Sequence, residues 1–183
     1  MDFRKINGKI ICALDILITK DEYLLKNDIS ERSISHKLAQ YLSNLFPRFN
    51  VDCEYNGNVE ADSGKKYIFL LKKTAEKYGL LKRDEKENEV VTRHVYPDII
   101  IHKRGKSDHN ILIIEIKKSS SDISINYDIE KLIGYTSQKN EKSLNYTYGV
   151  LLIIGVKDKF NKIKIQWFSS GESITPLSLI SLK

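Results

Sequence analysis

Two acidic residues lie inside apolar stretches of the chain, where a charge is costly. Asp98 follows Pro97 within residues 95–102, and Glu115 lies within residues 111–118. Both stretches have several apolar residues in succession, a pattern typical of strands that are covered on both faces. A carboxylate in such a strand is expensive unless it is paired or binds a metal ion. Asp98 and Glu115 are therefore candidate metal ligands.

The two predicted strands allow a register that brings these carboxylates together. If they form a symmetric antiparallel hairpin with Asp98 opposite Glu115, the turn centres between Lys106 and Ser107, within the turn-forming segment 105–108. The two Cβ atoms would then lie about 4.5–5.5 Å apart. Because like charges at that distance repel, a hard divalent cation between them would remove the conflict, and Mg²⁺ prefers such oxygen ligands.

Lys117 comes two residues after Glu115 and therefore projects from the same face of the strand. Its ammonium could orient a metal-activated water and stabilise the deprotonated form, which completes the requirements for hydrolysing a phosphodiester. Pro97 would interrupt strand pairing beside Asp98 and leave room for a metal and a substrate. The alternative is a surface hairpin with an ordinary Glu–Lys pair, since each short pattern alone occurs widely by chance. Their combination on adjacent strands favours an active site.

Glu31 is a candidate fourth member of this site. It begins a helix that is predicted to run to about Phe46, and it shares the core-facing stripe of Ile34 and Leu38. An inward-facing Glu31 could reach the edge of the sheet. The alternative is a capping box, Asp28-x-x-Glu31, in which Glu31 serves only the start of the helix.

These residues resemble the PD-(D/E)XK, or restriction-endonuclease-like, superfamily of nucleases. The matching features are Glu31 on the first core helix, Pro97-Asp98, and Glu115-Ile116-Lys117 followed by a helix and a buried strand. Several segments are also similar to a bacterial group of small nuclease-like proteins: 30–38, 52–56, 95–102 and 113–118. The resemblance covers roughly residues 28–156, whereas residues 57–93 show none of it and are interpreted as an insertion.

The resemblance implies a restriction-endonuclease-like α/β sandwich, with a central mixed sheet flanked by helices, and metal-dependent cleavage of nucleic acid. Asp98 and Glu115 would hold Mg²⁺, or Mn²⁺ as a substitute, together with the backbone carbonyl of Ile116. Lys117 would position the attacking water, and Glu31 would bind a second metal or a metal-bound water. The superfamily also has non-catalytic members. A silent nucleic-acid-binding module and an interaction subunit of a defence or repair assembly are therefore the alternatives.

Four further residues are weaker candidates for contact with the substrate. Lys131 lies on a helix expected at residues 127–139, and Lys72 and Lys73 lie on a basic helix expected at residues 66–81. His36 lies about 140° around its helix from Glu31, at about 100° per residue. For all four, a solvated or structural role is the alternative interpretation.

Three other polar residues lie near the predicted strands. His102 has the strand parity of Asp98 but is close to the predicted turn. Asp52 and Glu54 share parity on a strand expected at residues 49–55, so either could support the site. Ordinary surface polarity of the strand is the competing interpretation.

The remaining elements fit a single domain over residues 1–183. A helix is expected at residues 8–26, and strands at 148–156 and 162–168, followed by an apolar tail. An order in which helices and strands alternate in this way indicates an α/β sandwich around a mixed sheet. No internal repeat or low-complexity linker divides the chain.

Composition is consistent with a nucleic-acid partner. Among 183 residues, 30 are Lys or Arg and 24 are Asp or Glu, so the net charge is +6. This balance favours a polyanion, with nucleic acid first and an anionic membrane surface second, although a merely solvated surface would explain it too. For a nuclease, DNA is the expected substrate. Two isolated cysteines, no signal peptide and no apolar stretch long enough to span a bilayer lead us to expect a cytoplasmic protein without a membrane partner. A homodimer would allow both strands of a duplex to be cut, but no motif requires one.

Overall fold

The computed structural model describes residues 1–58, 64–85, 87–106, 108–138 and 144–182. Within these residues the central sheet is mixed. Its strand order is β1 (Asn50–Cys53), β4 (Ile99–His102), β5 (Leu112–Lys118), β6 (Tyr148–Ile154), β7 (Lys162–Ser169) and β8 (Glu172–Ser173), and β9 (Ser178–Ser181) also pairs with β7. Only β5 and β6 are parallel neighbours. The α/β class with a mixed central sheet is confirmed.

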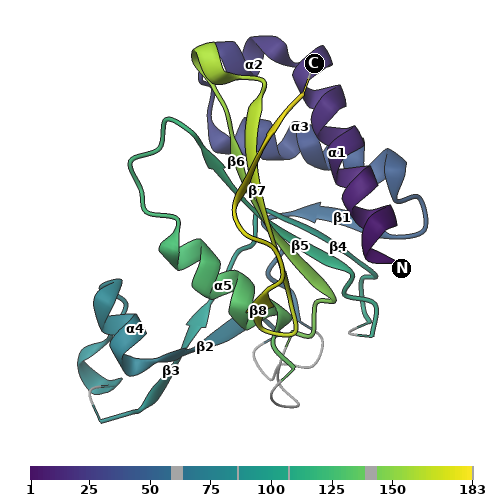
Figure 1. Cartoon of the computed structure of the whole chain (residues 1–183). Coiled ribbons are helices and arrows are strands. Elements are labelled where there is room, and N and C mark those ends of the chain that lie inside the picture. The colour runs from purple at the N-terminus through teal and green to yellow at the C-terminus, as the bar shows by residue number, and fades with distance from the viewer. Residues whose placement is uncertain (59–63, 86, 107, 139–143, 183) are drawn as a thin grey trace.

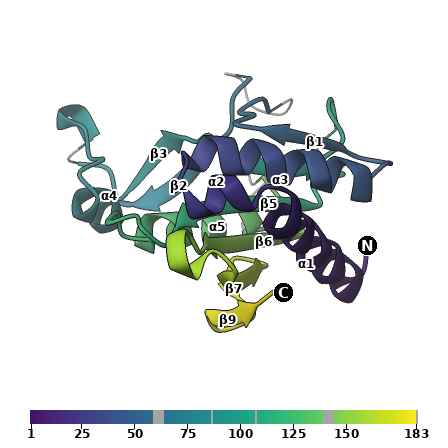
Figure 2. The same cartoon turned by 90° about the horizontal axis from the view of Figure 1, so that it is seen from above.

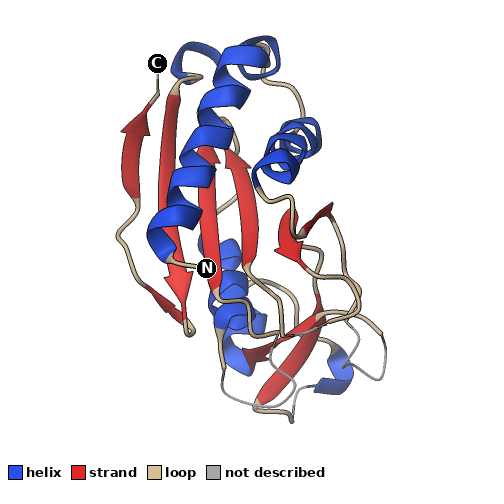
Figure 3. Cartoon of the chain, turned by 90° about the vertical axis from the view of Figure 1, so that its right-hand side faces the viewer, coloured by secondary structure: helices blue, strands red, loops and turns tan. Residues whose placement is uncertain are grey.

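Helices cover both faces of this sheet, which explains why its inner strands are apolar on successive residues. The helices α1 (Phe3–Lys20), α2 (Glu22–Lys26) and α3 (Glu31–Leu45) lie on one side, and α5 (Asn126–Thr136) lies on the other (Figures 1 and 3). Ile114 and Leu152 pack in the core beneath α1 and α3, whereas their neighbours Ile113 and Leu151 pack in the core beneath α5. Alternate residues of each strand thus enter different cores.

The predicted hairpin register is the one observed. Ile99 pairs with Ile114, and Ile101 pairs with Leu112, in antiparallel fashion. The same register places Asp98 across from Glu115, although regular pairing stops at Ile99. In the connection, Gly105 has φ +73°, a left-handed conformation that glycine adopts without steric cost. Ser107, the other centre of the predicted turn, lies outside the described residues.

The N-terminal prediction of one helix over residues 8–26 was wrong at its start and in its middle. α1 already begins at Phe3, because Ile6 also joins the buried face. It ends at Lys20, and a second short helix starts at Glu22. The break falls at Asp21, whose carboxylate accepts a hydrogen bond from the Tyr41 hydroxyl of α3. A tertiary contact therefore fixes the chain direction at this point.

The helix predicted at residues 66–81 was also wrong over its first part. That segment forms β2 (Tyr67–Leu71), which pairs with β3 (Val90–His94) in a separate two-stranded sheet, followed by the short α4 (Lys72–Lys77) and a 3₁₀ turn, η1 (Arg83–Glu85). Ile68 and Leu70 are buried while their neighbours are more exposed, which is the period of a strand. The partner strand decided the outcome. Figure 2 shows this ribbon and α4 at one side of the molecule.

The other boundaries differ by a few residues from those expected. The strand expected at residues 95–102 starts only at Ile99, after Pro97, and α5 ends at Thr136 although the prediction ran to Lys139, which lies outside the described residues. A further 3₁₀ turn, η2 (Lys157–Lys159), precedes β7, and the apolar tail supplies β8 and β9. In the part of the chain covered here, no helix has the length and apolarity needed to cross a membrane.

Candidate active site

The site forms where β5 extends beyond the start of β4. Past Ile114 the β4 edge of β5 has no paired strand residue, because β4 begins at Ile99 and Pro97 precedes it. A side chain takes over there: Asp98 Oδ2 accepts a hydrogen bond of 2.6 Å from the Ile116 N–H. Two residues on, Glu31 Oε2 accepts one of 2.9 Å from the Lys118 N–H. Carboxylates from two elements thus satisfy backbone donors that would otherwise be orphaned.

This open edge gathers oxygen atoms. In a strand the N–H and the carbonyl of one residue point to the same side, so the Ile116 carbonyl faces the edge where Asp98 and Glu31 are bound. The two N–H groups that donate to these carboxylates belong to Ile116 and Lys118. These residues are two positions apart along the strand, which corresponds to about 7 Å. Carboxylate and carbonyl oxygens are the ligand types that Mg²⁺ prefers. The predicted contribution of the Ile116 carbonyl is therefore sterically reasonable at this edge.

Glu115 points to the face of the sheet that α5 covers. Its side chain is almost fully buried, with 2% of the residue exposed. Glu115 Oε2 lies 2.6 Å from Lys131 Nζ, and Oε1 accepts a hydrogen bond of 3.0 Å from the Tyr135 hydroxyl. Both partners come from α5, which explains how the fold tolerates a carboxylate inside an apolar strand.

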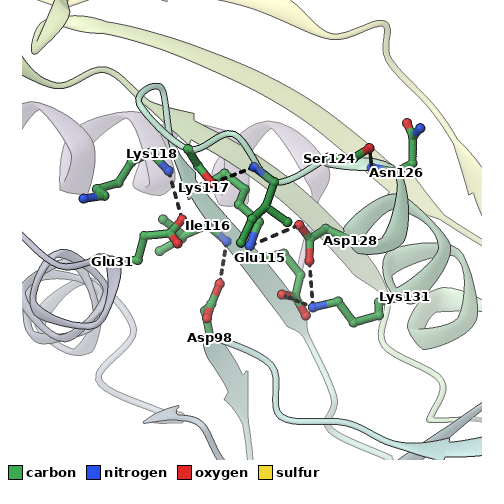
Figure 4. A network of polar contacts seen from close by, with 12 residues as sticks. Glu31, Asp98, Glu115, Ile116, Lys117, Lys118, Ser124, Asn126, Asp128 and Lys131 are labelled. Carbon is green, nitrogen blue, oxygen red and sulfur yellow. Dashed lines mark hydrogen bonds and ion pairs between the residues drawn. The ribbon is translucent and has the colours of Figure 1, made fainter. Parts of the chain in front are cut away.

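Asp128 joins the two lysines of the site. Its Oδ1 lies 2.8 Å from Lys131 Nζ, and its Oδ2 lies 3.5 Å from Lys117 Nζ. Asp128 itself is buried. As Figure 4 shows, Lys117 and Glu115 of β5 and the polar face of α5 form one network, while Asp98 and Glu31 reach β5 from its open edge. The strand parity predicted for Lys117 is thus the one observed.

Burial perturbs the two central carboxylates. It raises the pKa of Asp98 to about 6, although the hydrogen bond from the Ile116 N–H acts in the opposite direction. Burial also raises the pKa of Glu115 above its usual range, against the attraction of Lys131. In both cases the surroundings supply less positive charge than full ionisation requires. A cation at this position would remove the deficit.

The residues present only partly match a metal centre. Among the side chains that the structure describes, no group of three or more His, Cys, Asp and Glu is arranged to hold an ion. The reason is visible at Glu115, which is bound to Lys131 and Tyr135 and not directed at a shared point with Asp98. The chemistry of the donors nevertheless fits a hard divalent cation, since Asp98, Glu115 and Glu31 all offer carboxylate oxygens.

The capping-box interpretation of Glu31 was wrong. The N-cap of α3 is Ser30, whose hydroxyl accepts a hydrogen bond of 3.3 Å from the Ser33 N–H. Asp28 instead contacts Lys118 Nζ at 2.8 Å, the Ser120 hydroxyl at 2.8 Å and Lys157 Nζ at 3.2 Å. These bonds lower the pKa of Asp28 to about 2, with that to Lys118 contributing most. Asp28 thus links the segment before α3 to the end of β5 through these contacts.

The weaker candidates lie in different places. Lys131 belongs to the site, but its ammonium is occupied by Glu115 and Asp128 and only 13% of its side chain is exposed. Lys72 and Lys73 lie in α4, against the small β2–β3 sheet. His36 is exposed and lines a shallow hollow together with Arg32 of the same helix. Within the described residues, neither Lys73 nor His36 is bound to one of the four predicted catalytic residues.

The three lesser candidates do not join this site through their side chains. Asp52 and His102 contact each other at 2.9 Å at the opposite end of β4. The Glu54 carboxylate binds Arg32 at 2.8 Å, and only its backbone N–H reaches the carbonyl of Asp98.

Sequence reasoning missed Asp128 and Tyr135. Both lie on one stripe of α5 with Lys131, at positions i, i+3 and i+7, so the spacing alone places them on one helix face. Recognising that this polar stripe faces Glu115 would have required knowing how α5 packs on β5. Tyr135 is fully buried, and its hydroxyl would have suggested a polar partner in the core.

Comparison with protein-family models, with curated proteins and with solved structures found no match for this chain. The functional argument therefore depends on the geometry of the residues just described. That geometry defines a mixed α/β protein with a half-enclosed carboxylate and lysine centre at an open strand edge.

Proposed function

We propose that this chain is a metal-dependent nuclease with a restriction-endonuclease-like sandwich, and that it hydrolyses phosphodiester bonds, with DNA as the preferred substrate. One observation carries the proposal. Asp98, Glu115 and Lys117 converge where β4 stops pairing with β5, and Glu31 is bound at the same open edge. The four side chains come from α3, from the residue that precedes β4 and from β5, although 84 positions of the sequence separate Glu31 from Glu115.

The order of the elements supports the fold proposed here. Glu31 begins α3, Asp98 directly precedes β4, and Glu115 and Lys117 lie in β5, which is followed by α5 and the buried parallel strand β6. This is the arrangement that the resemblance implied. Helix α3 covers one face of these strands and α5 the other, so the sheet edge between them is the part of the sandwich that a substrate could approach.

The side chains divide the chemistry among themselves. A bound divalent cation would supply Lewis-acid activation of the phosphate and of water. Asp98 and Glu115 would hold that cation, together with the Ile116 carbonyl, and Glu31 would bind a second cation or its water. Lys117 would orient the attacking water and stabilise its deprotonated form, because its ammonium lies on the same face of β5 as Glu115.

Asp128 would keep Lys117 in place for this role. A lysine side chain has several rotatable bonds, so an ammonium that is to orient water needs a fixed partner. Asp128 Oδ2 lies 3.5 Å from Lys117 Nζ, and Asp128 is held in turn by Lys131 at 2.8 Å. The α5 network would thereby position the catalytic lysine without contacting the substrate.

The test is a cleavage assay with labelled single-stranded DNA, double-stranded DNA and RNA, each with Mg²⁺, with Mn²⁺ and with a chelator. We expect metal-dependent cleavage of at least one substrate, and loss of cleavage in Asp98→Asn. The matched control is Asp15→Asn, because Asp15 is exposed on α1, a helix that carries none of the proposed site residues. Nicked and doubly cut duplex products would also show whether the enzyme cuts one strand or both.

The proposal fails if the folded wild-type protein cleaves none of these substrates with either metal. It also fails if Asp98→Asn cleaves as fast as wild type, because the activity would then belong to a contaminant or to another site. Circular dichroism of both variants shows whether a loss of cleavage is a loss of fold.

A second candidate is a nucleic-acid-binding module that has kept the fold without the chemistry. The observation that favours it is the engagement of Glu115 by Lys131 and Tyr135, which occupies a carboxylate that a metal centre would need. Such a module would bind nucleic acid with an affinity that falls steeply with salt. Its binding would be indifferent to Asp98→Asn and to divalent metal.

A further inference from the structure

A second polar cluster lies on the same face of the sheet as Asp98, at the other end of β4. His102 is four residues from Asp98, so the two side chains share a strand face and are separated by about 13 Å. His102 Nε2 lies 2.9 Å from Asp52 Oδ2, and Arg104 binds both oxygens of the same carboxylate. The single negative charge of Asp52 is therefore already matched at this end by Arg104.

Lys66 adds a buried positive charge to this cluster. It is 3% exposed. Its Nζ donates to the Gly57 carbonyl and lies 4.5 Å from the centre of the Tyr55 ring, which in turn packs against His102. Within the described part of the chain, no carboxylate lies within ion-pair distance of Lys66. Burial accordingly lowers the pKa of Lys66 to about 8.

A small opening leads to these groups from the surface. Lys66, His102, Tyr55 and Asn110 line it, and Lys103 and Lys106 lie at its rim. The fully buried Tyr146 lies near this cluster, because Asp52 and Tyr55 both contribute to raising the pKa of its hydroxyl. That hydroxyl has no hydrogen-bond partner among the described residues. An unpartnered buried hydroxyl is uncommon and calls for a ligand, a water or an ion.

We propose that this opening is a binding site for a phosphate group, formed by Lys66 and His102 with Lys103 and Lys106 at its rim. Three lysines line the opening, and Arg104 already matches the charge of Asp52, so the surplus charge among the described residues is positive. A phosphate oxygen accepts charge-assisted hydrogen bonds from ammonium groups and would satisfy donors that the protein leaves underused. The site does not depend on the proposed nuclease activity.

The test measures the full chain in a chelator, so that metal chemistry plays no part. Sodium phosphate is titrated against sodium chloride at matched ionic strength, with binding followed by calorimetry and by the melting temperature. We expect saturable binding of inorganic phosphate to the wild type, and Lys66→Met should weaken it about tenfold or more. Lys164→Met, on the exposed face of β7, is the matched control and should leave phosphate binding unchanged.

A second variant keeps the test decisive if Lys66→Met does not fold. Lys103→Met combined with Lys106→Met changes only the rim, so the variant should fold and should also weaken phosphate binding. A short oligonucleotide without terminal phosphates then identifies the source of the group. If the oligonucleotide competes with inorganic phosphate, the site binds a phosphate of a nucleic-acid backbone. If it does not compete, the site binds free phosphate or a phosphomonoester.

Two results would overturn the proposal. One is a wild-type protein that phosphate stabilises no more than chloride does at equal ionic strength. The other is phosphate binding that survives both the Lys66→Met change and the double change at the rim. Absence of nuclease activity would change neither result, because phosphate binding is measured without a divalent metal and without a cleavable substrate.

Discussion

The two ends of β4 show opposite ways of burying charge on one sheet face. At the end near Asp98, burial raises the pKa of two carboxyl groups, Asp98 and Glu115. At the His102 end, burial lowers the pKa of an ammonium group, Lys66. Burial thus disfavours a negative charge at one end and a positive charge at the other.

The difference lies in what neighbouring elements supply. α5 brings Lys131 and Asp128 to the first end, so Glu115 has a direct ionic partner there. At the other end the Asp52 carboxylate is bound by Arg104, and Lys66 contacts a carbonyl and an aromatic face. This contrast among the described residues suggests a cation site and an anion site on the same face. Substitutions at the two ends test this contrast.

Lys117→Met should have the largest effect, on catalysis. We expect the cleavage rate to fall by about a thousandfold, a loss typical of removing a group that assists proton transfer or stabilises developing charge. The fold should persist, because the contact of Lys117 with Asp128 is long. Initial rates of metal-dependent cleavage check this, with Lys164→Met on β7 as the control. Comparable rates in the two variants would remove Lys117 from the mechanism.

Lys131→Met should cause the largest loss of stability. The change leaves Glu115 and Asp128 buried without their closest cation, and breaking a buried pair in this way costs about 3 kcal/mol. Urea unfolding at neutral pH measures the free energy. The double variant Glu115→Leu with Lys131→Met should recover most of it, because both charges are then absent. A single variant as stable as wild type would show that the α5 network does not support the site.

Lys66→Met makes the same kind of substitution at the other end of β4, and here we expect the protein to become more stable and not less. Removing a buried ammonium that has no ionic partner should raise the free energy of unfolding by about 1 kcal/mol in phosphate-free buffer. The same urea measurement checks it. A destabilisation as large as that of Lys131→Met would mean that Lys66 is a structural residue, and the contrast between the two ends would disappear.

Asp28→Asn should have the smallest effect on stability, and this effect should disappear at low pH. The folded pKa of Asp28 is about 2, below its ordinary value of 3.8, so its stabilisation is complete above about pH 4 and is lost as the pH falls towards 2. The wild type should therefore lose its advantage over Asp28→Asn across that window. We expect a difference of about 1 kcal/mol or less at neutral pH. Thermal unfolding of both proteins from pH 2 to pH 6 measures it, and an unchanged difference across that range would contradict the assignment.

Local patterns were sufficient to predict much of the site. The strand period placed Lys117 on the face of Glu115, and the symmetry of a hairpin predicted the register in which Ile99 meets Ile114. The helical period likewise gave α3 its inward stripe, with Glu31 at its beginning. These features depend on residues close in sequence, where backbone geometry repeats regularly.

The pairing of distant segments could not be predicted in this way. Residues 67–71 have enough apolar character for either a helix or a strand, and only their pairing with Val90–His94 decided for β2. The same pairing helped to bury Lys66, which the prediction had placed at the start of a basic helix. Burial of a charge depends on which elements pack over it, and period alone does not contain that information.

The residues of β5 and the hairpin symmetry were enough to predict that Asp98 and Glu115 lie in register and that Lys117 shares a face with Glu115. Which charges these groups meet depends on the packing of distant elements. Asp128, Lys131 and Tyr135 reach Glu115 because α5 crosses that face, and Glu31 reaches the Lys118 N–H because β4 begins too late to cover it. Strand geometry is local, whereas compensation of a buried charge requires partners brought from elsewhere in the chain.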